Sequence, residues 1–166
     1  KMPESWYFIG NHEQRIERAL DLSPELQGTV GYKDLALDDY YDEVVHYEGD
    51  TPGIRTIQGI AFAHYFISGV MGKSIGGQHM AHSLLTKNFK SSVQGHNHTL
   101  DFCERTDIDG NKIQGLVCGV YQDYNSAWAG ARNNLWWRGV TILNGAEGGR
   151  YDLQCISLTQ LKKEYS

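Results

Sequence analysis

VQGHNHTLDF, residues 93–102, places two histidines directly after a short run of β-prone residues. The first two residues of the stretch are typical of the end of a strand, and Gly95 is a residue at which a strand commonly breaks. Side chains in a strand alternate between faces, so His96 and His98 would point the same way only if the backbone between them is extended. Two imidazoles gathered at a strand end are a candidate metal site, because neutral imidazole is a common metal ligand.

Length and composition indicate one domain, spanning residues 1–166, with a substantial hydrophobic core. Apolar residues make up 40% and charged residues 21% of the chain, as in ordinary globular proteins. No apolar run approaches the roughly 20 residues of a membrane-spanning helix, so no membrane partner is expected. The net charge of −5 argues against a surface that tracks nucleic acid throughout, although a local basic groove is compatible with it. Three widely spaced cysteines favour reduced thiols and a cytoplasmic location.

Strand and helix patterns are mixed along the whole chain, which predicts a layered α/β domain. The segment 22–42 is expected to be a loop with short helical turns. A capping-box spacing between Ser157 and Gln160 places the start of the last helix. The expected elements are strands at 6–9, 43–48, 54–63 and 91–94, hairpins pairing 99–107 with 112–120 and 135–143 with 150–157, and helices at 13–21, at 78–89 and after 157.

Polar side chains follow three of these strands. GNHE, residues 10–13, comes after the first strand, His64 ends the strand 54–63, and GHNH, residues 95–98, follows the strand 91–94. Functional groups of α/β folds collect in the turns beyond the carboxyl ends of strands. A single histidine at a strand end is more often structural, but the three groups together offer imidazoles, an amide and a carboxylate for a metal.

In this order along the chain, GNHE, the strand-ending histidine and GHNH resemble the last three motifs of the calcineurin-like metallophosphoesterases. Both four-residue blocks fit the family patterns Gly-Asn-His-Asp/Glu and Gly-His-x-His. Further along, GGQH, LVCGVYQD and LWWRGV, residues 76–79, 116–123 and 135–140, look like the bacteriophage-borne members of the family. The resemblance covers essentially the whole chain. It implies an α-β-β-α sandwich and, for a viral protein, a location in the host cytoplasm.

The resemblance also implies an activity and a set of site residues. The activity would be hydrolysis of phosphate monoesters or diesters by a hydroxide activated by two divalent metal ions, with Mn²⁺ favoured over Fe, Zn or Mg. Asn11, His64 and His96 would bind one ion and His98 the other. Asn11 and His12 would contact the substrate, and His12 would act as a general acid or stabilise the transition state. Glu13 is expected to cap the helix or to orient a neighbour rather than to bind metal.

The sequence departs from the family in lacking two motifs, Asp-x-His and an early Gly-Asp block. The only Gly-Asp pair, Gly49-Asp50, follows GNHE and lies in a turn with Pro52, so it is not expected to serve. About half of a dinuclear site is then present, and one metal rather than two is an alternative for this chain. The simplest interpretation is the C-terminal part of a longer enzyme whose N-terminal strands are missing. Whether the missing motifs lie on the parent chain or on a partner is open, as is the activity of this chain alone.

Two other functions remain as alternatives. One is a non-catalytic fragment that binds a single metal and a phosphate or nucleic acid. The other is a mononuclear hydrolase that uses Asn11, His64 and His96 with water. The substrate could be a phosphodiester, a phosphoprotein or a nucleotide, and the loops at 22–42 and 121–135 are expected to decide between them. Neither the metal nor the oligomeric state follows from the sequence.

Several other side chains have both a structural and a functional interpretation. The histidines at 79 and 82 are expected on a helix surface, with phosphate contact as the alternative. Five aromatic residues between positions 121 and 137, which we call the aromatic cluster, are expected to pack in the core. Exposed aromatic rings can instead stack on the bases of a single strand of nucleic acid. Arg132 and Arg138 could steer an anionic substrate. The cluster consists of Tyr121, Tyr124, Trp128, Trp136 and Trp137.

Overall fold

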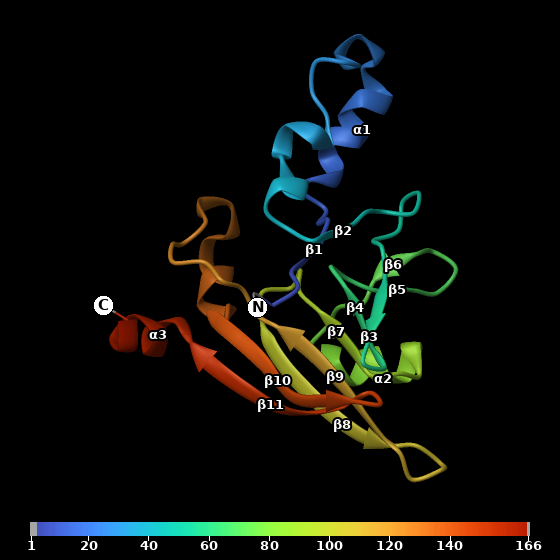
Figure 1. The fold of residues 1–166 in the computed structure, drawn as a ribbon, viewed down its shortest axis with the longest axis vertical. Helices are drawn as coiled ribbons and strands as arrows, with labels where there is room; N and C mark the ends of the chain where they lie inside the picture. Colours follow the sequence, from blue (N-terminus) through green and yellow to red (C-terminus); the bar gives the residue numbers. More distant parts are fainter. Residues whose placement is uncertain (1–2, 166) are drawn as a thin grey trace. The chain divides into compact units, whose positions relative to one another are not determined.

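The computed structural model describes residues 3–165. This part of the chain divides into two compact units, one up to Arg55 and one from Thr56 onward. Both contain strands and helices, and the second contains a five-stranded mixed sheet (Figure 1). The predicted mixed α/β class is therefore confirmed.

The first unit is a pair of parallel strands joined by a mostly helical segment of the chain. β1 (Trp6–Phe8) pairs with β2 (Glu43–Val45) in a register that sets Tyr7 opposite Val44. The segment between the strands contains α1 (Gln14–Leu22) and the short 3-10 helices η1 (Pro24–Leu26), η2 (Tyr32–Leu35) and η3 (Leu37–Asp39). The strand, turn, helix and helical loop predicted for residues 6–42 are thus confirmed.

The entry to both strands is fixed by one carboxylate. The backbone N–H and the hydroxyl of Ser5 donate to Asp42 Oδ2 at 2.7 and 2.8 Å. These bonds hold the pKa of Asp42 below its usual range, because they favour the ionised carboxylate. The chain therefore enters β1 and β2 side by side.

The sheet of the second unit has the strand order β3-β4-β7-β9-β8. β4 pairs parallel with β7, β7 pairs parallel with β9, and β8 with β9 forms the predicted antiparallel hairpin. The carboxyl ends of β4, β7 and β9 consequently lie at one edge of the sheet. The bounds are β3 (Arg55–Ile57), β4 (Ile60–Ala63), β7 (Ser92–Gln94), β8 (Leu100–Thr106) and β9 (Lys112–Cys118).

The segment predicted as one strand at 54–63 is two strands. Gln58 and Gly59 both have positive φ angles, 50° and 83°, and they form the turn between β3 and β4. A second small feature, the antiparallel pair β5 (Ile67–Ser68) and β6 (Lys73–Ser74), lies in the segment predicted as a glycine-rich link.

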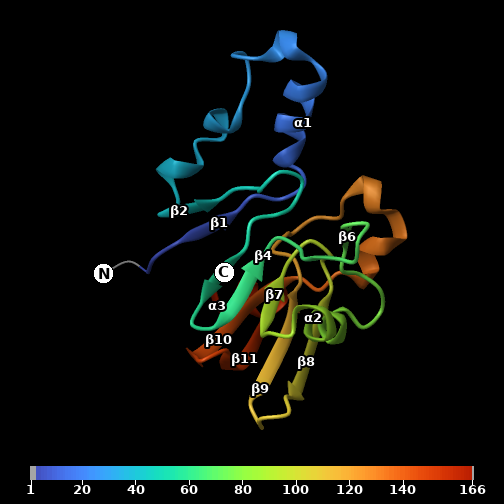
Figure 2. The ribbon, with the colours of Figure 1, turned by 90° about the vertical axis from the view of Figure 1, so that its right-hand side faces the viewer.

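Helix α2 (Met80–Asn88) covers one face of this sheet, and the hairpin of β10 (Gly139–Glu147) and β11 (Arg150–Ser157) covers the other (Figures 1 and 2). The helix buries Ala81 and Leu84 completely, and Asp101 Oδ2 accepts from the Ala81 N–H at 2.8 Å at the start of the helix. β9 approaches the helix at Gly115, where an added Cβ would lie 2.4 Å from the Ala81 carbonyl oxygen. The absent side chain therefore sets the distance between helix and sheet.

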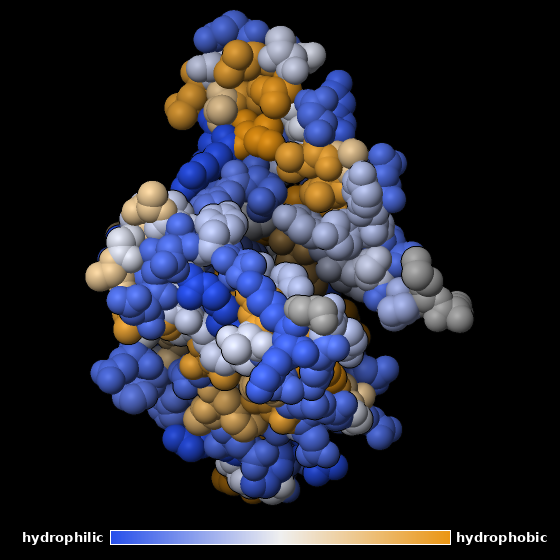
Figure 3. Space-filling model, turned by 90° about the vertical axis from the view of Figure 1, so that its left-hand side faces the viewer, coloured by the Kyte–Doolittle hydropathy of each residue, from blue (hydrophilic) through white to orange (hydrophobic). Residues whose placement is uncertain are grey.

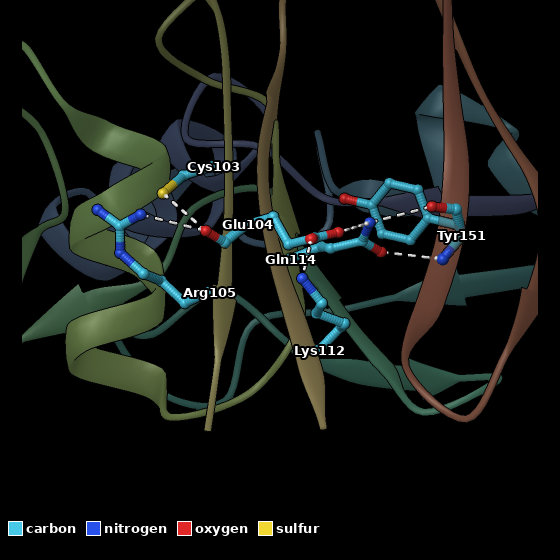
Figure 4. Close-up of polar contacts among 6 residues, drawn as sticks. All are labelled: Cys103, Glu104, Arg105, Lys112, Gln114 and Tyr151. Carbon is cyan, nitrogen blue, oxygen red and sulfur yellow. Dashed lines mark hydrogen bonds and ion pairs between the residues drawn. The ribbon is translucent and has the colours of Figure 1, made fainter. Parts of the chain in front are cut away.

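The hairpin is tied to the sheet by a buried carboxamide (Figure 4). Gln114 Oε1 accepts from the backbone N–H of Tyr151 at 2.9 Å, and Gln114 Nε2 donates to the Tyr151 carbonyl at 3.0 Å. The Gln114 side chain of β9 thus pairs with the backbone N–H and C=O of Tyr151 in the hairpin, as the backbone of an adjacent strand would.

The first strand of this hairpin begins later in the chain than predicted. Residues 135–138 were expected in the first strand, but η4 (Ala127–Leu135) ends there and β10 begins at Gly139. The final helix α3 (Leu158–Tyr165) starts after Ser157, whose Oγ accepts from the Gln160 N–H at 3.2 Å as the capping pattern predicts. No helix within residues 3–165 is both long enough and apolar enough to cross a membrane.

Replacing Gly115 by alanine is expected to lower the free energy of unfolding by about 1–3 kcal/mol, because the new methyl group pushes β9 away from α2. Gly76→Ala is the matched control, since nothing lies within 4 Å of its added Cβ and its φ is not positive. Urea unfolding of both variants measures the difference. Equal stability of the two would contradict this account of the helix–sheet contact.

Candidate functional site

Parallel pairing of β4 with β7 brings two of the predicted site residues together. Ala63 is the register partner of Gln94, so the chain leaves both strands at the same level. The Gly95 N–H then donates to the His64 carbonyl at 3.1 Å. Beyond this bond, His96 Nδ1 lies 3.2 Å from His64 Nε2.

This nitrogen–nitrogen distance fits a shared metal ion. Two ligand nitrogens that lie about 2.1 Å from one ion, at angles of roughly 90–110°, are about 3.0–3.4 Å apart. The same distance suits one N–H···N hydrogen bond between a donor and an acceptor tautomer. His64 and His96 can therefore hold an ion or share a proton, and Tyr65 packs against both rings at centroid distances of 5.7 and 4.8 Å.

The backbone that presents the histidines is strained. His96 and His98 have φ angles of 58° and 63°, in the left-handed region that residues with a Cβ rarely adopt. The turn was predicted at Gly95, but Gly95 has no positive φ, and the segment from His96 to His98 is not extended as the shared-face argument requires. Such outliers cost about 1–3 kcal/mol each and cluster at functional sites.

The buried side chain of Gln94 holds the two histidine loops in place. Its Oε1 accepts from the Phe66 N–H at 3.2 Å, and its Nε2 donates to Asn97 Oδ1 at 2.8 Å and to the Ile75 carbonyl at 3.3 Å. Phe66 follows His64 closely, and Asn97 lies between the other two histidines. One fully buried amide therefore links the loop after β4 to the loop after β7.

His98 faces an aromatic neighbour that the sequence pattern did not reveal. Its ring meets the Trp136 ring edge-on, with centroids 4.4 Å apart and an interplanar angle of 88°. Its carbonyl accepts from the Trp137 N–H at 3.0 Å. The orientation of His98 is thus set by the segment that precedes β10, about 40 residues further along the chain.

Asn11 and His12 belong to the first unit, in the turn between β1 and α1. Asn11 is half-buried and His12 is exposed. Glu13 Oε2 accepts from the Gly10 N–H at 2.8 Å, so its carboxylate orients the neighbouring turn, whereas its side chain makes no capping bond to α1. Burial, followed by the nearby Glu13 carboxylate, raises the pKa of Tyr7. That Asn11 and His12 share a site with His64 stays a prediction.

The other polar candidates behave as surface residues. His79 and His82 are exposed at the start of α2, as predicted. Within residues 3–165, no three side chains of His, Cys, Asp or Glu are arranged as a metal-binding group. The predicted ligand set also relies on an asparagine amide, which is not among those four residue types.

The expected burial of the aromatic cluster is wrong for three of its members. Tyr121, Tyr124 and Trp128 are 69%, 67% and 62% exposed, whereas Trp136 and Trp137 are half-buried. The exposed rings come from the loop that contains η4. This loop therefore presents aromatic side chains to solvent instead of filling the core.

Comparison of the chain with protein-family models, with curated proteins and with solved structures finds no match.

Gln94→Leu is expected to lower the free energy of unfolding by about 1–3 kcal/mol, because it leaves the Phe66 N–H and the Ile75 carbonyl without this partner. The variant should also shift the NMR signals of the His64 and His96 rings. The control Gln154→Leu changes an exposed glutamine of β11 and should leave both unaffected. Unchanged histidine signals in folded Gln94→Leu would contradict the positioning role.

Proposed function

We propose that this protein is a metal-dependent phosphoesterase that hydrolyses phosphate monoesters or diesters. The observation that carries the proposal is the 3.2 Å approach of His96 Nδ1 to His64 Nε2 at the carboxyl ends of two parallel strands. The order of GNHE, the strand-ending histidine and GHNH along the chain, with its resemblance to the calcineurin-like metallophosphoesterases, adds the reaction class.

The layers of the second unit support the corresponding fold. α2, the five-stranded sheet and the β10–β11 hairpin follow one another as helix, sheet and sheet. This is the order of one helical layer and the two β layers of an α-β-β-α sandwich. The complete sandwich, including the outer helical layer on the far side, is part of the proposal.

The donor set suits a borderline divalent ion such as Mn²⁺, with Fe, Zn or Mg as alternatives. We assign His64 and His96 to one ion and His98 to a second, and the family resemblance alone adds Asn11 as a ligand of the first. When bound, these ions lower the pKa of a water molecule and neutralise the charge of the phosphate.

The protein's own residues hold and protonate the substrate. His12, exposed at the turn before α1, is the assigned general acid: in its protonated form it gives a proton to the leaving alkoxide. The Asn11 amide donates to a phosphate oxygen in the same assignment. The Glu13 carboxylate, bonded to the Gly10 N–H, fixes the backbone from which both side chains extend.

A second candidate function is a non-catalytic module that binds one metal and a phosphate or nucleic acid. The observation that favours it is the contact of the His98 ring with Trp136, because an indole whose centroid lies 4.4 Å from that of the imidazole leaves less room around the ring assigned to the second ion. The lack of an Asp-x-His motif in the chain points the same way.

Native mass spectrometry in Mn²⁺ tests the metal assignment. The protein is expected to retain at least one Mn²⁺, and His64→Ala or His96→Ala should each weaken Mn²⁺ binding by more than the roughly 10- to 100-fold typical of residues that only orient ligands. His82→Ala, an exposed histidine on α2, is the matched control and should bind Mn²⁺ like the original chain. Equal binding by all four proteins would contradict the assignment.

His12→Ala separates catalysis from metal binding. It is expected to bind Mn²⁺ normally and to lower the rate of phosphate-ester hydrolysis by about 10²- to 10⁴-fold, as loss of a general acid does. Release of phosphate or alcohol from a monoester and a diester measures the rate. If the original chain binds Mn²⁺ and phosphate but turns over neither ester, the non-catalytic module is the correct alternative.

A further inference from the structure

Beside His98, the second unit carries a connected row of rings and a cation. Trp136 contacts His98, Trp128 lies 5.7 Å from Trp136 between ring centroids, and the Arg138 guanidinium carbon lies 5.7 Å from the centre of the Trp136 ring. We call Trp128, Trp136 and Arg138 the aromatic platform. It runs from the histidine assigned to phosphate chemistry to a largely exposed indole.

Hydrogen bonds within the loop 126–133 fix the backbone of the aromatic platform. The buried Asn133 side chain accepts from the Ser126 N–H at 3.0 Å and donates to the carbonyls of Ser126 and Gly130 at 2.9 and 2.8 Å. Gly130, with φ 51° and ψ −130°, makes the kink inside η4. These bonds close the loop around Trp128 and fix the backbone that carries its exposed ring, so little backbone freedom remains to be lost when a ligand stacks on it.

Charge around the platform favours an anionic ligand. Residues 121–138 contain Arg132 and Arg138 but only one acid, Asp123, which is ion-paired with Lys162. The Arg138 guanidinium is oriented by bonds to the Asn125 side chain and the Tyr124 carbonyl, at 2.8 and 3.4 Å. The positive charge next to the rings is therefore fixed in place, although the chain as a whole carries −5.

The surrounding surface argues against a purely apolar ligand. The face of the second unit in Figure 3 is mostly hydrophilic, with apolar side chains in small patches. The exposed indole of Trp128 and the half-buried indole of Trp136, next to Arg138, suit a ligand that combines a flat ring with negative charge. A nucleobase joined through its sugar to a phosphate has both properties, and base–aromatic stacking tolerates any sequence.

We infer that the aromatic platform binds the base of a nucleotide-containing phosphate ester, while the phosphate lies toward His98. The inference rests on the proposed phosphoesterase site and names its substrate class. A single strand of nucleic acid and a free nucleotide share this chemistry. A phosphopeptide, which lacks the base, would gain little from the platform.

The test compares an oligothymidylate of about twelve nucleotides with an abasic oligomer of the same length. Fluorescence anisotropy in EDTA removes any contribution from metal and from turnover. The intact protein should bind the base-containing strand about tenfold more tightly than the abasic strand. Trp128→Ala should abolish this difference and Trp128→Tyr should restore most of it. Phe89→Ala, which removes an aromatic ring that is 82% exposed at the end of α2, should change nothing.

Competition distinguishes the sources of the ligand. Thymidine monophosphate and unlabelled oligothymidylate each compete with the labelled strand. If the two competitors displace it at similar concentrations, counted per base, the ligand of the platform is a free nucleotide. If thymidine monophosphate displaces it much more weakly, the ligand is a single strand. The inference is overturned if the protein binds both oligomers equally, if Trp128→Ala keeps the preference, or if a phosphoserine peptide binds as tightly as the oligomer and also depends on Trp128.

Failure of this inference and failure of the proposed function have different signatures. If His64 and His96 bind Mn²⁺ but the base makes no difference, the aromatic platform is not a base-binding surface and the phosphoesterase assignment stands. If binding depends on the base and on Trp128 while no Mn²⁺ is bound, the phosphoesterase assignment fails.

Discussion

The parallel pairing of β4 with β7 is the constraint on which the candidate site depends. Because Ala63 and Gln94 are register partners, the loops that leave both strands start at the same level of one sheet edge. A shift of one residue would turn every side chain of the strand to the other face and separate His64 from His96. The helix packed on Gly115 and the hairpin held by Gln114 cover the two faces of this sheet and keep that register fixed.

The site combines strain with rigid support. Two left-handed histidines cost about 1–3 kcal/mol each, and a hydrogen bond contributes only about 0.5–1.5 kcal/mol net. Gln94 alone supplies three such bonds from a fully buried amide, so its contribution is comparable with the strain of one histidine. The further bond from Trp137 N–H to the His98 carbonyl fixes the second. A loop held in this way presents its imidazoles with little freedom to relax, which suits a pre-formed site.

Much of this arrangement follows from local sequence patterns. The strand ends and the helix after GNHE were predicted, because β-prone runs ended in polar turns. The approach of His64 to His96 was expected from the resemblance of the three motifs to the family. The turn at Gln58 and Gly59 was missed, because the β-prone residues on both sides were interpreted as one strand although Gly59 is a residue at which strands commonly break. The left-handed histidines and the contact of His98 with Trp136 depend on packing between distant segments, which no local pattern encodes. The exposure of Trp128 was also misjudged, because large aromatic residues are usually buried.

The central claim is that His64 and His96 share one metal ion. Crystals grown in MnCl₂, with diffraction data collected at the manganese absorption edge, would locate that ion directly. The account predicts an anomalous peak about 2.0–2.3 Å from both His64 Nε2 and His96 Nδ1. A map without a peak there, in which the two rings are joined only by an N–H···N hydrogen bond, would contradict it.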